Sequence, residues 1–202
     1  MADFNAIGAI STTLTGLIED KYLSEFSKKT KVELYQTSNF KEPIEGDLNE
    51  GFFSLFLYRV AINGNVRNCS FRRTPDGQRY RPSLPLDLYY LITPWATDCE
   101  RQHRMLGWVM RMLEDACPLS SSYLNHKQYT DGSDTFLTTE SIDIICDPLA
   151  LNDYFTIWDR LGALPLSITY VLRMVMIDSK ESIDDGKLVQ TRIFDVGKVL
   201  ET

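Results

Sequence analysis

Three segments carry the pattern of long β-strands, and they constrain the fold more than any other feature of the sequence. Residues 52–62 (FFSLFLYRVAI) are apolar on both faces apart from a serine and an arginine, which predicts a strand that is covered on both sides. Residues 84–93 and 166–177 alternate between two sets of side chains, one of them largely aliphatic or aromatic. Together the three segments predict the centre of one β-sheet.

Helical patterns lie before, between and after these strands. Residues 4–22 repeat apolar side chains at helical spacing, with Asp3 as the candidate N-cap. Thr97 and Glu100 have the spacing of a capping box, which predicts a helix that continues until Pro118. A third, short helix is predicted over residues 151–161, before Gly162 as its C-cap.

Shorter strand patterns at residues 32–34, 119–124 and 136–146 complete the predicted fold. No internal repeat or linker divides the chain, so the predicted fold class is α+β: a single domain with a mixed, mostly antiparallel β-sheet flanked by about three α-helices. We assign residues 1–179 to this domain and residues 180–202 to a C-terminal arm. The arm contains one more strand candidate, from Leu188 to Phe194.

The distribution of charge is uneven. The net charge of the 202 residues is -7, with 21 basic and 28 acidic side chains. Nine arginines nevertheless lie between Arg59 and Arg111, where only four carboxylates oppose them, so this window carries +5 and the remainder -12. A chain with a basic middle and acidic flanks can present complementary patches to neighbouring subunits.

Residues 65–82 (NVRNCSFRRTPDGQRYRP) combine five arginines with a Pro-Asp-Gly turn, which predicts a long projecting loop or hairpin. Arginine together with Phe71 and Tyr80 is typical of a protein interface. The same composition would suit nucleic-acid binding, the alternative function, although the surrounding negative charge opposes it. A simple solvated loop remains the third interpretation.

The helix that follows Thr97 has a second basic face, on which Arg101, Arg104 and Arg111 flank Trp108. An exposed Trp between arginines predicts a surface that a partner covers, unless the ring folds onto the domain itself. The full set of candidate interface residues is Arg67, Arg72, Arg73, Arg79, Arg81, Arg101, Arg104, Trp108, Arg111, Leu188, Val189, Ile193 and Phe194.

Catalytic and cofactor motifs are missing from the sequence. It has no phosphate-binding glycine motif and no nucleophile elbow, and its two histidines do not support a catalytic triad. Cys99, His103 and Cys117 are too nonspecific a set to predict a metal site. We therefore predict no catalytic residue, no metal and no cofactor. The widely spaced cysteines and the absence of a signal peptide or a membrane-span pattern predict a soluble protein made in the cytoplasm.

Several blocks of the sequence together resemble one known family. They are DFNAIGAISTTLTGLIED, SLFLYRV, LPLDLYYLITPWATD, ERQHRMLGWVMRMLED, DPLALNDYFTIWDRLGA and LPLSITYVLRMVMIDS, in this order over about residues 3–179. This pattern is similar to the N-terminal cap domain of tail-terminator proteins of phage-tail-like extracellular contractile injection systems, of the antifeeding-prophage type. The chain departs from that pattern in the arginine-rich segment at residues 67–82 and in its tail from Lys180 onward.

The resemblance implies a structural subunit that is not an enzyme. It implies a homo-hexameric ring at the distal end of the inner tube, which binds the last ring of sheath protein, ends polymerisation and stabilises the extended sheath. The implied partners are other copies of the chain, the sheath protein and the inner tube protein, with neither nucleic acid nor membrane insertion. The resemblance leaves open whether a second cap paralog takes part and whether the assembled particle is released from the cell.

Overall fold

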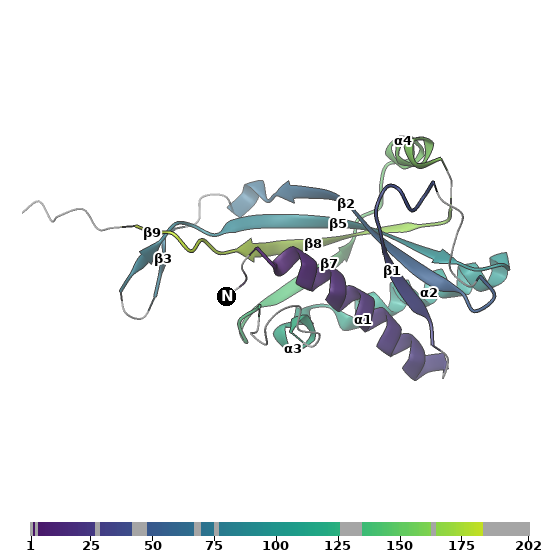
Figure 1. Cartoon of the computed structure of the whole chain (residues 1–202), viewed down its shortest axis with the longest axis horizontal. Helices are drawn as coiled ribbons and strands as arrows, with labels where there is room; N and C mark the ends of the chain where they lie inside the picture. Colours follow the sequence, from purple (N-terminus) through teal and green to yellow (C-terminus); the bar gives the residue numbers. More distant parts are fainter. Residues whose placement is uncertain are drawn as a thin grey trace, which may run out of the picture.

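The computed structural model describes residues 2, 4–26, 29–41, 48–66, 70–74, 77–125, 135–162 and 165–183. Helices and strands follow one another along these residues without a boundary that would divide the domain (Figure 1). In chain order they are α1 (Ala6–Phe26), β1 (Lys31–Tyr35), β2 (Phe52–Ile62), the 3-10 helix η1 (Gly64–Val66), β3 (Arg72–Arg73), β4 (Arg79–Tyr80), β5 (Leu84–Trp95), α2 (Cys99–Ala116), β6 (Leu119–Ser120), α3 (Ser121–Leu124), β7 (Ser141–Cys146), α4 (Leu151–Leu161), β8 (Ile168–Ile177) and β9 (Ser182–Ile183).

Six strands form the main sheet, in the order β1-β2-β5-β8-β7-β6. Only β1 is parallel to its neighbour; the other neighbouring strands are antiparallel. The three long strand patterns of the sequence are β2, β5 and β8, which lie side by side. The prediction of a mixed, mostly antiparallel sheet is therefore confirmed.

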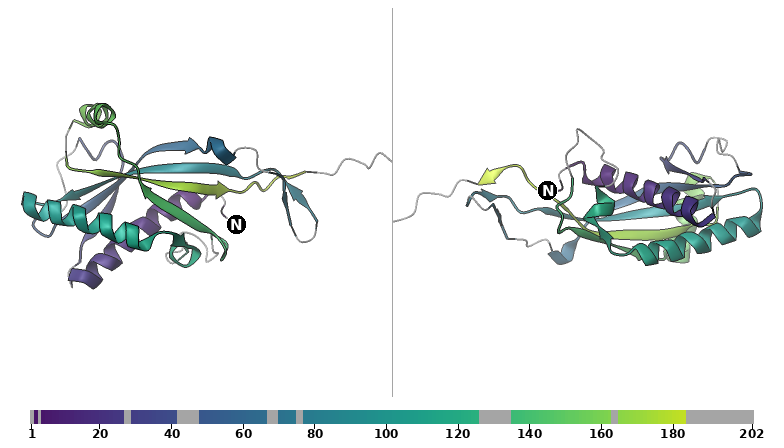
Figure 2. Two further views of the ribbon diagram at one scale, coloured as in Figure 1. Left: turned by 180° about the vertical axis from the view of Figure 1, so that it is seen from behind. Right: turned by 90° about the horizontal axis from the view of Figure 1, so that it is seen from below.

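Helices cover the two faces of the main sheet unequally. α1 and α2 lie across one face, and α4 lies over one end of the other (Figure 2). On the first face, Leu14 of α1 and Leu88 of β5 are completely buried in one core. On the second face, Leu91 forms a smaller core with Trp158 of α4. The alternation of side chains along β5 thus supplies both cores.

Two short strand predictions were longer than the strands that form. The strand expected over residues 136–146 begins only at Ser141, because side chains take the place of a strand partner before it. The Asn125 amide bonds the backbone of Phe136 in both directions, and the Glu140 carboxylate accepts from the amide of Leu137 at 2.7 Å.

The strand expected over residues 119–124 ends at Ser120, and the helical turn α3 follows it. The described part of the chain therefore has four α-helices where about three were predicted.

The ends of the helices test the capping predictions. Gly162 ends α4 with a left-handed φ of 80° and donates its backbone N–H to the carbonyl of Trp158, as predicted. The capping box was wrong by one residue: the N-cap of α2 is Asp98, whose carboxylate accepts from the Arg101 amide at 2.9 Å. Thr97 instead donates its backbone N–H to the carbonyl of Leu48. Asp3 lies outside the described residues.

Candidate interaction surfaces

A second, small sheet extends beyond the main sheet at one end of the molecule. It has the order β3-β4-β9, with antiparallel pairing throughout. Figure 1 shows it past the ends of β5 and β8, and we call it the projecting sheet. The sequence prediction of a projecting hairpin over residues 65–82 is confirmed where the structure describes it. The pairing of β9 with β4 was not predicted, because a strand of two residues has no periodicity to detect.

The projecting sheet brings four predicted arginines together, and its internal contacts hold three of them. The guanidinium of Arg72 lies 4.7 Å from the ring centroid of Tyr80, and that of Arg79 lies 4.8 Å from the ring of Phe71. Arg81 forms an ion pair with Glu181 at 3.1 Å. Stacking on an aromatic ring fixes the plane of each guanidinium group.

The remaining groups of the projecting sheet point to solvent or to the connection after β8. Arg73 is exposed, and Phe71 keeps 49% of its surface exposed. The carboxylate of Asp178 lies 3.9 Å from Arg72, whose guanidinium also donates to the carbonyl of Ser179. Carboxylates thus lie among the arginines and weaken the positive field that nucleic-acid binding would require. Arg67 lies outside the described residues.

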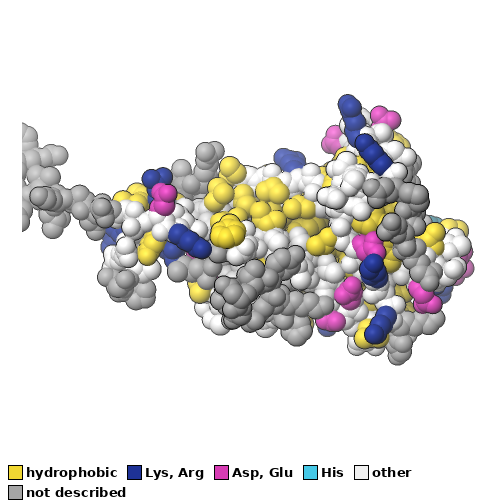
Figure 3. Space-filling model, in the orientation of Figure 1, with side chains coloured by type: hydrophobic (Ala, Val, Ile, Leu, Met, Phe, Trp, Pro, Cys, Tyr) yellow, Lys and Arg dark blue, Asp and Glu magenta, His cyan; other side chains and the backbone are white. Residues whose placement is uncertain are grey.

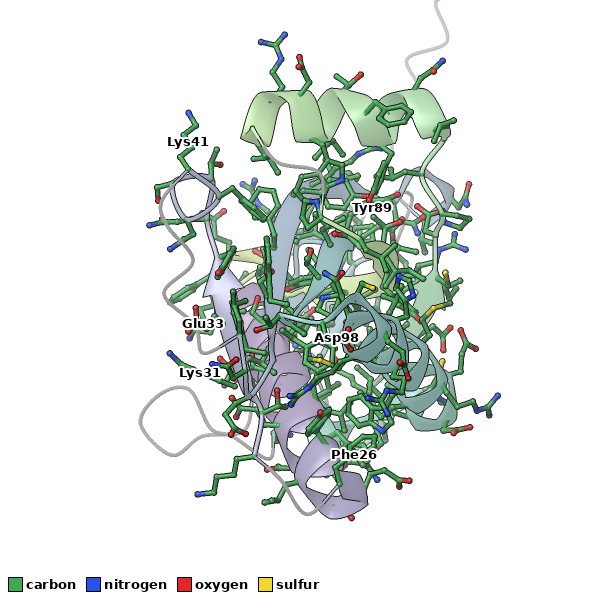
Figure 4. The ribbon with its side chains drawn as sticks, turned by 90° about the vertical axis from the view of Figure 1, so that its right-hand side faces the viewer. Phe26, Lys31, Glu33, Lys41, Tyr89 and Asp98 are labelled. Carbon is green, nitrogen blue, oxygen red and sulfur yellow. The ribbon has the colours of Figure 1, made fainter. Side chains whose placement is uncertain are left out.

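The structure settles the position of Trp108 on the predicted face of α2. This ring is half buried and packs edge-on against Tyr22 of α1, with ring centroids 5.0 Å apart. It also contacts Phe26, which lies at the end of α1 (Figure 4), and Phe53 of β2. Of the two interpretations that the sequence left open, the structure favours the second: the ring packs onto the domain itself, although onto α1 and β2 rather than onto a loop. Helix periodicity alone does not show this crossing of α1 over α2.

The three arginines of this face have different roles in the structure. Arg101 donates to the backbone carbonyls of Asn49 and Glu50 and so anchors the loop before β2. Arg111 bonds Asp115 one turn later, with 3.0 Å between Nε and Oδ2. This hydrogen bond lowers the pKa of Asp115 and raises that of Arg111. Arg104 is exposed, so Arg104 and Arg111 are the arginines that α2 presents to solvent.

Side chains around this face form a groove between α1 and α2 of about 480 Å³. Trp108 lines it together with Lys21, Glu25, Arg111 and Asp115, whose charges are mixed. Phe26 keeps 46% of its surface exposed close to the same ring. The surface of α2 therefore carries a groove of mixed polar and apolar lining, rather than a tryptophan that stands alone.

Hydrophobic side chains gather on another part of the surface. Figure 3 shows them over β2 and β5, between the projecting sheet and α4. Val60 and Ile62 of β2 and Leu84 of β5 each expose more than 40% of their surface. The apolar run at residues 52–62 predicted a strand covered on both sides. Its first residues are buried, but its last residues are largely exposed, and β1 pairs with it only as far as Phe56.

Chemical sites are not evident in the part of the chain that the structure describes. No three His, Cys, Asp or Glu side chains there come close enough to hold a metal ion. Cys99 is exposed, while Cys117 and Cys146 are half buried. None of the helices described is long and apolar enough to cross a membrane. Leu188, Val189, Ile193 and Phe194 of the predicted arm lie outside the described residues.

Comparisons with known proteins agree on one kind of relative. The family model described as the Pvc16 N-terminal domain matches residues 9–191. The fold is similar to a solved structure described as the PVC sheath/tube terminator of an extracellular contractile injection system in its extended state. That match has a TM-score of 0.60 and 16% identity, and it covers 97% of this chain and 63% of the other.

A second solved structure, the tube-terminating cap of the anti-feeding prophage, matches with a TM-score of 0.49 and 18% identity over 75% of this chain and 54% of that one. No curated protein matches the sequence. The chain thus spans less than two thirds of the length of either solved relative.

Proposed function

Because the chain belongs to the Pvc16 N-terminal domain family, we propose that it is a structural cap subunit, or tail terminator, of a contractile injection system. The observation that carries the proposal is the likeness to a sheath/tube terminator along nearly the whole chain. In this role the protein closes the distal end of the inner tube and binds the last ring of sheath subunits, and it catalyses no reaction. It is made in the cytoplasm and becomes part of a phage-tail-like particle.

The proposed assembly is a homo-hexameric ring. A ring needs two different surfaces on each subunit, so that one subunit's surface meets the other surface of its neighbour and the rotation closes. The projecting sheet, with exposed Arg73 and Phe71 at one end of the molecule, supports such a head-to-tail contact. Phe71 is already ordered by its stacking with Arg79, so it loses little conformational entropy when a partner binds.

The groove between α1 and α2 is the second proposed surface. Its half-buried Trp108 ring and the exposed guanidinium groups of Arg104 and Arg111 suit a partner segment with acidic and aromatic side chains, such as one from the sheath or the tube protein. Residues 180–202 are proposed to act as an arm, with Leu188, Val189, Ile193 and Phe194 as its contact residues.

Particles that lack this protein provide the main test. If the chain ends polymerisation, its deletion gives sheaths of uncontrolled length or sheaths that contract prematurely in negative-stain micrographs. Complementation with the intact chain restores uniform, extended particles. Particles of normal length and stability without the protein would contradict the cap function.

A charge reversal tests the projecting sheet within that function. Arg73→Glu changes an exposed side chain, and we expect it to reduce the fraction of capped particles several-fold while the purified protein stays folded. Arg160→Glu on α4 is the matched control, because it makes the same charge change at another exposed position. Equal capping by the two variants would exclude a contact at Arg73 and leave the cap function intact.

The alternative function, nucleic-acid binding, is tested by measuring the affinity of the protein for DNA or RNA. A protein that neutralises phosphates binds DNA or RNA with an affinity that falls steeply with salt, and Arg73→Glu would weaken that binding. We expect no such binding, because Glu181 and Asp178 lie among the arginines.

A further inference from the structure

We infer that the last residues of β2 form an open sheet edge that accepts residues 188–194 of a second copy of this chain as an added strand. The inference rests on the ring and the arm proposed above, and it identifies the surface on which the arm binds.

The edge exists because the parallel neighbour of β2 is too short. β1 pairs with β2 only between Phe52 and Phe56, so in the described part of the chain no strand flanks β2 on that side beyond Phe56. β2 continues along β5 to Ile62, as its outer neighbour (Figure 1). Unpaired strand edges of this kind are natural templates for a further strand.

The direction of the backbone groups follows from one hydrogen bond. Ile62 lies opposite Leu86, so Asn63 lies opposite Pro85, and the Asn63 amide donates to the Pro85 carbonyl at 3.0 Å. In an antiparallel ladder, hydrogen-bonded positions alternate with positions whose N–H and C=O point the other way. Val60 and Ile62 therefore direct their N–H and C=O groups to the open side.

The side chains at the same positions are exposed as well. Val60 and Ile62 keep 46% and 49% of their surfaces exposed, although their cross-strand partners Leu88 and Leu86 are buried in the core. A strand added beside them would extend the apolar face of the sheet by one row. Its burial would therefore add to the energy of the new hydrogen bonds.

Two other outward-facing edges of the main sheet are covered by the chain itself. At β1, the Val32 amide donates to the Glu19 carboxylate at 3.1 Å, and just after the strand the Gln36 amide donates to Asn39 at 2.9 Å. At β7, the backbone groups of Ile144 point away from β8, but the residue as a whole is 98% buried. Proteins normally block sheet edges in such ways. An edge that stays open is therefore a candidate binding site for a further strand.

The open edge is held rigidly in place. The buried carboxylate of Asp87 on β5 accepts two hydrogen bonds from the Asn63 side chain, each of 3.1 Å, at the end of β2. The same carboxylate accepts from the amide of Met174 on β8, where the register shifts and Met174 has a φ of 64°. Three strands are thus joined at this point, and an incoming strand meets a preorganised partner.

The length and starting point of the arm identify the occupant. Four residues, 184–187, connect Ile183 to the proposed strand at 188–194, and they span up to about 17 Å when extended. At β9 the described chain runs along the projecting sheet, away from the body of its own molecule (Figures 1 and 2). A segment that starts there is directed toward a neighbour rather than toward its own β2.

The sequence of the arm matches the edge. Val189, Thr191 and Ile193 fall on one face of an extended strand, and β-branched residues of this kind pair favourably with Val60 and Ile62. Each copy then donates one arm and accepts another. This arrangement gives the head-to-tail contact that a closed ring requires.

Crosslinking between isotopically distinct copies tests the pairing. A photoreactive benzoylphenylalanine at position 62 is placed in full-length ¹⁵N-labelled protein, which is mixed with unlabelled protein under conditions where rings form. We expect crosslinks from labelled position 62 to unlabelled peptides that contain residues 188–194. Crosslinks within one copy, to another partner, or to other segments would overturn the inference.

Matched tail variants test the side-chain recognition. Ile193→Asp places a charge within the proposed strand, and Val199→Asp makes a comparable change in the same tail outside it. We expect the first to lower the intermolecular crosslink yield about tenfold or more and the second to leave it unchanged.

Proline variants test the backbone geometry. Val60→Pro removes an N–H group that faces the open side of β2, so the protein should stay folded. Ala61→Pro removes an N–H group that bonds β5, so this variant should unfold. If Val60→Pro also proves unstable, Ile62→Lys tests the edge by charge alone.

The cap function and the arm pairing can fail separately. Particles that remain capped when Val60→Pro and Ile193→Asp are present would exclude the arm pairing as the ring contact and leave the cap function standing. Uncapped particles, together with loss of the crosslink, are the expected result.

Discussion

In the body of the molecule, long strands are buried under helices, whereas the projecting sheet consists of strands of two residues whose side chains are exposed or only partly buried. Leu88 of β5 is completely buried, but none of the described residues of β3, β4 and β9 is. The body is held by apolar burial, which scales with the area removed from water. The projecting sheet is held by stacked arginines and ion pairs, which contribute little each at exposed positions.

This difference separates stability from recognition. Changes in the projecting sheet can alter its charge and shape without unfolding the body, while changes in the body affect every surface at once. A structural subunit benefits from this division, because its contact surfaces can be matched to partners on a scaffold that stays constant. Four measurements test the division, in order of decreasing expected effect on stability.

Leu88→Ala gives the largest effect. The side chain is completely buried in the main core, so we expect the free energy of unfolding to fall by about 2–5 kcal/mol in urea titrations. Leu84→Ala on the same strand is the matched control, because Leu84 is 44% exposed and should cost less than about 1 kcal/mol. Equal losses would show that burial does not distinguish the body from its margins.

Alkaline pH tests a buried polar group of the body. Burial raises the pKa of Tyr90 to about 12, and a hydrogen bond of 2.8 Å to Ser11 only partly opposes this shift. In the unfolded chain the tyrosine ionises near pH 10, so the folded state keeps its proton longer. This contribution to stability is fully present below pH 10 and is lost as the pH rises to 12.

The Tyr90→Phe variant isolates that contribution. We measure how far the free energy of unfolding falls between pH 9 and 11.5 in both proteins. The fall should be smaller for Tyr90→Phe than for the unchanged protein, by on the order of 2 kcal/mol. Ser11→Ala retains the phenol and should retain the alkaline loss. If Tyr90→Phe shows the same alkaline loss as the unchanged protein, another group must be responsible.

Sequence patterns predicted the body better than the surfaces. The strands β2, β5 and β8 follow from periodicity over ten or more residues, since burial repeats with every second side chain. The position of Trp108 could not be predicted, because it depends on where α1 crosses α2. The open edge at Val60 was also hidden, because it results from the short length of β1, a strand that comes from another part of the sequence.

Local sequence signals were reliable where one residue decided the structure. Gly162 ends α4 as expected, because a left-handed φ strongly favours glycine. At the start of α2, Thr97 and Asp98 both offer an oxygen, and tertiary contacts decided between them: the backbone of Thr97 is held by Leu48, and Asp98 becomes the cap. Arginines were located correctly as a cluster, but their pairing with Tyr80, Phe71 and Glu181 needed the fold.

The cap of α2 provides the third measurement. Asp98→Ala removes the acceptor for the Arg101 amide, and we expect a loss of about 1 kcal/mol in the free energy of unfolding. Thr97→Ala is the control and should have a smaller effect, because the Thr97 backbone makes the contact with Leu48. A larger loss for Thr97→Ala would restore the capping box that the sequence pattern indicated.

Arg72→Met gives the smallest global effect and the sharpest local one. The substitution keeps an apolar stem against Tyr80 but removes the guanidinium that reaches Asp178 and the Ser179 carbonyl. We expect the free energy of unfolding to fall by less than about 1 kcal/mol, because the contacts lie near the surface. Hydrogen exchange of the β4 and β9 amides should increase, since these strands have no buried core, while exchange in β5 and β8 should stay unchanged. If exchange increased equally in β5, the projecting sheet and the body would form one cooperative unit, and the two regions would not be separable.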